Sequence, residues 1–434
     1  MSDKLTIVAD WEHLDVGSPE ERAAFAAIGI QFGDLWLTEA EDTFVKRVRQ
    51  QVHLSGYHLA EWFAWNWWRL RWEPRRPSVD WRMTHRMSTI GGGYVWPNIT
   101  ILSDGERICF DTKPTASRAS EPLHYITSLA LVMRASDFEA AVDAFINQVL
   151  GQLREKDLPD SNLKIIWADV LSERATPDVA SRRKLEALLG LDADEADKSL
   201  IEQMIQDGKV LGARAIEELA ADGNGAKMPV TPSDINGLAR DLGLDANPRD
   251  VVHLQVRNRE ALPTNVEAWK RGVAAARALR NQEGLHDGPI SNERLCELMG
   301  VSSKAVSRDQ KTGPISFVFD EGQEKGAIVL RSKYETGRRF DLARLLGDRI
   351  AAPMIERLKP ATRSYTYRQK LQRAFAGEFL CPFDALADLL GGDLSADARE
   401  DAASHFNVSE RTVSSLLVNH KMIGREELDF DLVA

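Results

Sequence analysis

The chain has 434 residues, of which 43% are hydrophobic and 28% charged, and its formal net charge is -11. A chain of this length exceeds what a single hydrophobic core usually organises, so we expect two or three domains. No apolar run approaches the roughly 18 residues that span a bilayer. The first residues lack the basic, apolar and small regions of a signal peptide. We therefore expect a cytoplasmic protein without a membrane partner.

The cysteines do not form a recognisable site. Cys109, Cys296 and Cys381 are far apart in the sequence, and there is no CxxC pair. This spacing argues against a disulfide framework and against a cysteine-rich zinc site, and we expect no cofactor. The negative net charge argues against a uniform coating of nucleic acid, although it permits a local basic patch.

Residues 1–155 form a first, tryptophan-rich α+β block. Nine of the eleven tryptophans precede residue 97, and "HLAEWFAWNWWRLRWEPRR" repeats them at helical spacing until Glu73-Pro74 ends the helix. A helix that is apolar on most sides is usually buried, although tryptophans beside arginines can also stack on nucleotides. Two strands are predicted around the Asp104-Gly105 turn, followed by a long helix with Ser136 as its N-cap.

Residues 156–262 form an acidic, helical middle region with a linker near 221–233, where "ADGNGAKMPVTPSD" breaks the helical pattern. Residues 263–434 form the last block. In it, "PISFVF" and "AIVLRS" flank the loop "DEGQEKG", which predicts a pair of strands. A helix over "RRFDLARLLGD" and a helix-rich tail follow. The fold class expected for the whole chain is α+β and mostly helical.

The order of elements in the last block resembles the ImmA/IrrE family of zinc metallopeptidase domains. "RRFDLARLLGD" is similar to the family pattern R-x-F-x-L-A-H-E-L-G-H, and "RQKLQRAFAGEFLCP" is similar to E-x-x-A-N-x-F-A-x-E-L-L-M-P. The helices of "AARALRNQEGLHDGPISNERLCELMGV" and the strand pair stand where the family has its opening elements. The resemblance implies a zinc-peptidase-like fold over the C-terminal domain, with final helices that resemble a helix-turn-helix.

This chain departs from the family pattern at the zinc-ligand and catalytic positions. The two histidine positions carry Arg344 and Asp348, the catalytic glutamate position carries Leu345, and the third-ligand position carries Gln369. In an HExxH helix the two histidines share one helical face and bind zinc, while the glutamate activates the bound water. A guanidinium is always protonated and cannot ligate a metal, and leucine cannot activate water. The expectation is a pseudo-metallopeptidase without catalytic residues and without a metal.

The segment 331–373 is basic, with twelve Arg or Lys against four acids, or a net charge of +8. Such a local field can bind phosphates or an acidic protein face, although it can also be a solvated, salt-bridged surface. The candidate anion-binding or nucleic-acid-binding residues are Arg331, Lys333, Arg338, Arg339, Arg344, Arg349, Arg363, Arg368, Lys370 and Arg373.

Two segments resemble a helix-turn-helix, "NERLCELMGVSSKAVSRDQK" and "REDAASHFNVSERTVSSLLVNHK". In such motifs the second helix enters the major groove of DNA. Their degenerate pattern also occurs in ordinary helical packing.

The sequence is compatible with three functions. The first is a regulatory protein that grips a protein or nucleic-acid partner without cutting it. The resemblance places such a protein in stress, mobile-element, toxin-antitoxin or phage-defence settings. The second is a DNA-binding transcriptional regulator that uses the helix-turn-helix-like segments and the basic segment. The third is an enzyme with its site in the N-terminal block, for which the sequence offers no nucleophile-base pair, metal cluster or phosphate loop.

Overall fold

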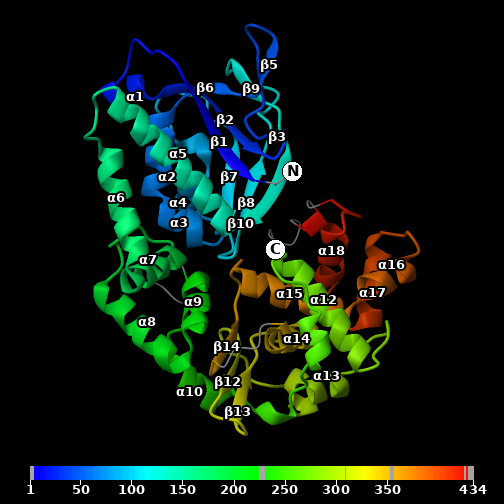
Figure 1. The fold of residues 1–434 in the computed structure, drawn as a ribbon. Coiled ribbons are helices and arrows are strands. Elements are labelled where there is room, and N and C mark those ends of the chain that lie inside the picture. Colours follow the sequence, from blue (N-terminus) through cyan, green and yellow to red (C-terminus); the bar gives the residue numbers. More distant parts are fainter. Residues whose placement is uncertain (1–3, 224–229, 308, 352–355, 425–426, 429–434) are drawn as a thin grey trace. The chain divides into compact units, whose positions relative to one another are not determined.

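The computed structural model describes residues 4–223, 230–307, 309–351, 356–424 and 427–428. It shows a mixed α and β protein in which helices predominate and the strands form several small antiparallel sheets (Figure 1). The described residues divide into two compact units, one up to Ile201 and one from Glu202 on. Each unit has its own hydrophobic core. No helix within the described ranges is both long and apolar enough to cross a bilayer.

The first unit combines three antiparallel sheets with a set of helices. The strands are β1 (Leu5–Trp11), β2 (Phe25–Phe32), β3 (Leu35–Trp36), β4 (Ala40–Asp42), β5 (Arg47–Arg49), β6 (Val52–Ser55), β7 (Ile99–Ser103), β8 (Arg107–Thr112), β9 (Leu123–Tyr125) and β10 (Leu129–Arg134). The helices are α1 (Pro19–Ala23), α2 (Gly56–Trp65), α3 (Trp67–Trp72), α4 (Val79–His85), η1 (Met87–Thr89), α5 (Ala135–Glu155), α6 (Asn162–Ala175) and α7 (Pro177–Leu189).

The pairing of these strands is local. Strand β2 lies between β1 and β3 and also pairs with β6, β8 lies between β7 and β10, and β4 lies between β5 and β9. The strands expected around the Asp104-Gly105 turn are β7 and β8. Helix α5 covers β1, β8 and β10, and its Phe138 meets Phe63 edge-on and Phe110 in a tilted arrangement in the core.

Two local expectations for this unit need correction. The tryptophan-rich stretch is two helices, because α2 ends at Trp65 and α3 begins at Trp67, with Asn66 donating its side-chain N–H to the Trp62 carbonyl at the junction. Most of its indoles belong to the core, but Trp65 is 64% exposed. Helix α5 begins after Arg134 without a side-chain cap, so Ser136 is not its N-cap.

The second unit packs helices on one four-stranded sheet. Its helices are α8 (Lys198–Leu211, which begins in the first unit), α9 (Ala213–Asp222), α10 (Pro232–Leu242), η2 (Pro248–Asp250), α11 (Val256–Glu260), α12 (Ala268–Gln282), α13 (Asn292–Leu298), η3 (Ser303–Val306), α14 (Glu335–Ala351), α15 (Tyr367–Leu380), α16 (Phe383–Leu390), α17 (Ala396–Phe406) and α18 (Glu410–Asn419). Its strands are β11 (Leu244–Ala246), β12 (Ser316–Asp320), β13 (Gly326–Val329) and β14 (Leu358–Ala361), in the order β11-β13-β12-β14.

The segment 156–262, expected as a separate region, is divided between the two units. Its helices α6 and α7 belong to the first unit, whereas α9 and α10 belong to the second. The expected linker near 221–233 falls between α9 and α10, and most of it lies outside the described residues. The predicted strand pair is β12 and β13, which pair antiparallel.

Helices α12, α14 and α15 form the centre of the second unit, with α15 packed against both of the others (Figure 1). Helices α12 and α15 run parallel, because Tyr367 bonds to the Val266 carbonyl near their first turns and Arg277 pairs with Glu378 near their last. A Cβ added at Gly347 of α14 would lie 2.6 Å from the ring of Phe375, so the close crossing of α14 and α15 depends on that glycine.

Candidate pseudo-active site

The structure brings together the positions that correspond to the zinc ligands of the family. Arg344 and Asp348 stand one turn apart on α14, and Gln369 faces them from the first turn of α15. The Arg344 Nη2 atom lies 2.6 Å from the Gln369 side-chain oxygen. Leu345 points elsewhere and is fully buried in the core. The convergence of these three side chains was expected from the resemblance, whereas their partners were not.

The Arg344 guanidinium is buried and donates to acceptors that carry no formal charge. Its Nη2 atom donates to the Thr362 carbonyl at 2.6 Å, to Gln369, and more weakly to the Gln372 side-chain oxygen at 3.4 Å. The nearest carboxylate oxygen, on Asp341, is 3.8 Å away. Burial, with the like charge of Arg373 nearby, lowers the pKa of Arg344 to about 10, so the group still carries its charge at neutral pH.

Asp348 is neutralised by a bidentate partner. The Nε and Nη2 atoms of Arg368 donate to its two carboxylate oxygens at 2.7 and 2.6 Å, and Gln372 donates to it at 3.0 Å. Burial alone would lower the pKa of Arg368, but the charge of Asp348 and its hydrogen bonds outweigh burial and raise it. This planar two-point pairing is the strongest ion-pair geometry available to arginine.

The two glutamines join these groups to strand β14. The side-chain oxygen of Gln369 accepts from the Thr362 N–H at 2.9 Å, while its amide nitrogen donates to the Pro360 carbonyl at 3.1 Å. Gln372 donates to the same carbonyl at 3.1 Å. These groups form a closed network of amides, one guanidinium and one ion pair.

Glu218 of α9 completes this network, and sequence reasoning missed it. Its carboxylate accepts from the Thr366 hydroxyl at 2.7 Å. Burial raises its pKa to about 6, although Arg368, Thr366 and Gln369 act in the opposite direction. Glu218 lies 126 residues before Arg344 in the chain, so no local pattern links the two. Gln372 could have been found, because it lies one turn after Gln369 on the same helical face.

The expected basic surface is largely internal. Arg338 donates to the Ala305 carbonyl at 2.7 Å, and Arg339 donates to the carbonyls of Ile290 and Asn407 at 2.6 and 3.0 Å. Arg338, Arg339 and Arg344 are 1%, 0% and 3% exposed, so the expectation that they contact phosphates is wrong.

The other candidate anion-binding residues lie in different environments, some paired inside the protein and some exposed. Arg349 pairs with Asp320 at 2.7 Å, Arg368 pairs with Asp348, and Arg373 bonds to the Ser364 carbonyl at 2.8 Å. Lys333 and Arg363 are exposed, and Arg331 and Lys370 are partly exposed. The net charge of the segment 331–373 therefore does not form one continuous basic face.

One of the two helix-turn-helix-like segments lacks a second helix. In "NERLCELMGVSSKAVSRDQK", α13 is followed only by the four-residue 3-10 turn η3, which is too short to lie in a groove. The other segment forms α17 and the ten-residue α18.

No group of three or more His, Cys, Asp or Glu side chains in the described part of the chain is arranged to hold a metal ion. No protein family, curated protein or solved structure matches this chain. The interpretation of the site rests on its own residues.

Proposed function

We propose that this protein is a non-catalytic binding protein whose second unit is an ImmA/IrrE-like peptidase framework with a rebuilt centre. The observation that supports this proposal most directly is the set of contacts around Arg344. A charged guanidinium stands at a metal-ligand position and is bonded to Gln369, at another, and to the Thr362 carbonyl.

The chemistry of the side chains agrees with a non-catalytic role. Zinc peptidases need neutral imidazoles or carboxylates as ligands and a base that takes a proton from the bound water. Here the base position is the buried Leu345, and the carboxylate of Asp348 is already bonded to Arg368. The residues present do not fit a zinc ion, so no hydrolytic step is proposed.

The proposed role is regulatory, in the stress, mobile-element, toxin-antitoxin or phage-defence settings of the family it resembles. A protein partner is favoured over nucleic acid, because most basic side chains of the segment 331–373 are engaged in internal hydrogen bonds and ion pairs. Binding that depends on phosphates would need those side chains at the surface.

Zinc reconstitution tests the framework. The fourfold variant R344H/L345E/D348H/Q369E restores the family pattern, and we expect it to bind about one zinc ion per chain. The wild-type protein should bind none after the same incubation and dialysis. Metal content is measured by mass spectrometry, with circular dichroism to verify that the variant is folded and R344H/D348H alone as a two-ligand control.

Two results would contradict the proposal. Stoichiometric zinc and peptidase activity in the wild-type protein would contradict the non-catalytic role. A folded fourfold variant that binds no zinc would contradict the peptidase framework. If the fourfold variant does not fold, the zinc content and activity of the wild-type protein still test the non-catalytic role.

A DNA-binding regulator is the second candidate, and it depends on α17 and α18 alone. Asn407 takes a left-handed conformation at the turn, Val408 is buried, and the Ser409 hydroxyl accepts from the Thr412 N–H to cap α18. These are general helix-capping features, which the tight turn of a helix-turn-helix also uses. Arg411 is exposed on α18, so R411E should abolish salt-dependent binding to duplex DNA in fluorescence anisotropy. If no duplex binds at low salt, this candidate fails.

A further inference from the structure

The turn between β4 and β5 exposes apolar side chains that contribute nothing to the core. Phe44 is 83% exposed, and Val45 and Val48 are 51% and 59% exposed. Together these residues form a small apolar cluster at a protruding turn, here called the β4–β5 tip (residues 43–48). Contiguous apolar surface of this kind usually marks a site of interaction.

The β4–β5 tip is held in place by hydrogen bonds. One carboxylate oxygen of Asp42 accepts from the backbone N–H groups of Phe44 and Val45, each at 3.1 Å. Both the N–H and the hydroxyl of Thr43 donate to the Pro122 carbonyl at 2.9 Å. Lys46 closes the turn in the left-handed region, with φ at +52°. The apolar side chains are therefore presented in a fixed geometry, which lowers the entropic cost of docking.

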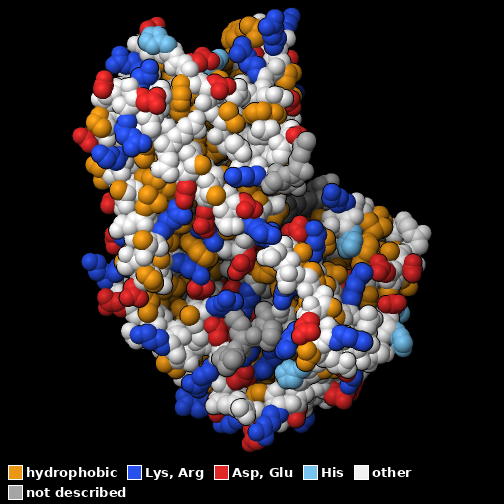
Figure 2. Space-filling view, in the orientation of Figure 1, with side chains coloured by type: hydrophobic (Ala, Val, Ile, Leu, Met, Phe, Trp, Pro, Cys, Tyr) orange, Lys and Arg blue, Asp and Glu red, His pale blue; other side chains and the backbone are white. Residues whose placement is uncertain are grey.

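The β4–β5 tip also carries unpaired positive charge. Lys46 and Arg47 are exposed, and neither has an acidic partner among the residues that the structure describes. Arg49, by contrast, lies 3.4 Å from Asp42. Basic and hydrophobic side chains gather at the end of the β4–β5 hairpin in the space-filling view (Figure 2). The surface that fits this tip is an apolar pocket with an acidic rim.

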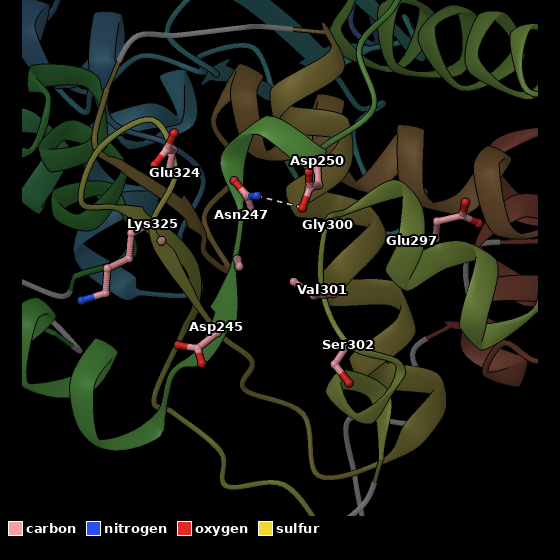
Figure 3. A pocket seen from close by; sticks show the side chains of 11 residues that line it. Asp245, Asn247, Asp250, Glu297, Gly300, Val301, Ser302, Glu324 and Lys325 are labelled. Atoms are coloured by element: carbon pink, nitrogen blue, oxygen red, sulfur yellow. Dashed lines mark hydrogen bonds between the residues drawn. The ribbon is translucent and has the colours of Figure 1, made fainter.

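The second unit has an acidic pocket with two apolar side chains in its lining, here called the acidic pocket, with a volume of about 680 Å³ (Figure 3). It lies between strand β11, the turn 300–302 after α13, and the turn 324–326 before β13. Four carboxylate side chains line it: Asp245, Asp250, Glu297 and Glu324. Glu297 is paired with Arg294 at 2.7 Å and Glu324 with Arg249, so Asp245 and Asp250 are the carboxylates left to receive a basic partner. Ala246 and Val301 add apolar surface, and the one basic lining residue, Lys325, is paired with Glu321 at 2.7 Å.

We propose that the β4–β5 tip of one copy of this chain docks into the acidic pocket of a second copy. Phe44 and Val45 would pack on Ala246 and Val301, while Lys46 and Arg47 would face Asp245 and Asp250. The charge complementarity and the fixed presentation of the tip carry the proposal, which is independent of the function proposed for the Arg344 network. A head-to-tail contact of this kind closes into a ring or a reciprocal dimer, or continues as a chain.

A contact made by one turn is smaller than a standard protein interface, so the association is weak and depends on concentration. We expect a dissociation constant of about 10 to 100 µM at low salt. Raising the ionic strength should weaken it several-fold, because the charged partners lie at the rim.

Sedimentation velocity over a range of protein concentrations tests the proposal with four variants of the full chain. F44S, R47E and D245R should each weaken association about tenfold or more. The double variant R47E/D245R restores an opposite pair and should recover most of the lost association. Asp245 is exposed on the edge strand β11, so its substitution should leave the fold intact.

Two matched controls separate the tip from general changes in charge and polarity. V16S removes an apolar side chain that is 73% exposed elsewhere in the first unit, and R154E reverses an exposed charge on α5. Neither should change the association. A protein that stays monomeric up to about 500 µM overturns the proposal. So does self-association that F44S and D245R leave unchanged, or a double variant no better than the single ones.

Discussion

Two buried arginines, Arg69 in the first unit and Arg344 in the second, have different kinds of partner. In the first unit, Arg69 reaches Glu73, Asp80 and Asp192 at 2.7, 2.5 and 3.3 Å. In the second unit, Arg344 instead meets a carbonyl and side-chain amides. Burial by itself lowers the pKa of both groups, but the carboxylates around Arg69 reverse the direction there. Arg69 is thus a buried positive charge matched by carboxylates, whereas Arg344 is a buried positive charge stabilised mainly by hydrogen bonds to uncharged acceptors.

Other arginines repeat these two environments, and the second unit contains both, because its Arg368 pairs with Asp348. Arg183 in the first unit pairs with Glu173, Glu186 and Asp194, and these carboxylates outweigh burial and raise its pKa. In the second unit, burial lowers the pKa of Arg338 and of Arg339, which donate to backbone carbonyls. When an arginine pairs with a buried carboxylate, its removal leaves that carboxylate without a counter-charge. When it donates to backbone carbonyls instead, it holds segments of backbone together. The predictions below test this difference, from the largest effect to the smallest.

R69M should have the largest effect, a loss of about 3 to 5 kcal/mol in the free energy of unfolding. It leaves the carboxylate of Glu73, which is 1% exposed, with Arg76 at 3.4 Å as its remaining cation. Urea unfolding followed by tryptophan fluorescence measures this change, because ten of the eleven tryptophans lie in the first unit. The double variant R69M/E73Q should recover part of the loss. A loss below about 1 kcal/mol for R69M would break the comparison.

Acidification should destabilise the first unit through His85. This ring is stacked on Trp81 and lies 3.9 Å from Glu73, near Arg69 and Asp80, and burial lowers its pKa from 6.5 to about 3. The unfolded chain therefore takes up a proton below pH 6.5 while the folded chain does not. Between pH 6.5 and about 4.5 we expect a loss of about 3 kcal/mol. Urea unfolding of wild type and H85Q across this window checks it, and equal slopes for the two proteins would refute it.

Acidification should act with the opposite sign at Glu218 in the second unit. Its folded pKa, about 6, lies above the ordinary value of 4.5, so the folded state holds the proton more tightly. The charged carboxylate therefore costs about 2 kcal/mol above pH 6, and that cost disappears as the pH falls to 4.5. Hydrogen exchange of peptides from α14 and α15 should show added protection at pH 5 in wild type but not in E218Q. Identical protection in both would exclude this role.

R344M should have the smallest effect, a loss of about 1 to 2 kcal/mol. It leaves the Thr362 carbonyl without its guanidinium donor, but it also removes a buried charge whose nearest carboxylate, on Asp341, is 3.8 Å away. Hydrogen exchange of the same peptides measures the change, with R344K as the variant that keeps the charge and loses the planar donor. A loss as large as that of R69M would mean that the two arginines do not differ in this respect.

The sequence predicted the helix over α14 that carries part of the candidate site. The spacing of Arg344 and Asp348 places them on one helical face, and the structure adds the hydrogen bond from Arg344 to Gln369 of α15. Local propensity and the family-like pattern suffice for such positions, because each depends on residues within one or two helical turns.

The sequence did not predict that the basic residues would be buried. The polar pattern of "RRFDLARLLGD" suggests an exposed face, yet Arg338 and Arg339 meet carbonyls from turns that lie far away in the chain. Every residue has a backbone carbonyl, so the sequence does not indicate which carbonyls will accept a hydrogen bond from an arginine. For the same reason Thr362 and Pro360 were not foreseen as partners. The exposed cluster at Phe44 was missed because a phenylalanine between two strand-like stretches is normally a core residue.

Pro360 has a consequence for how the second unit can bind a polypeptide. It lies in β14, at the edge of the sheet, where a free strand edge could otherwise template another strand. Proline has no N–H to offer, and its carbonyl already receives the amides of Gln369 and Gln372. This margin of the sheet is therefore closed to strand addition at Pro360.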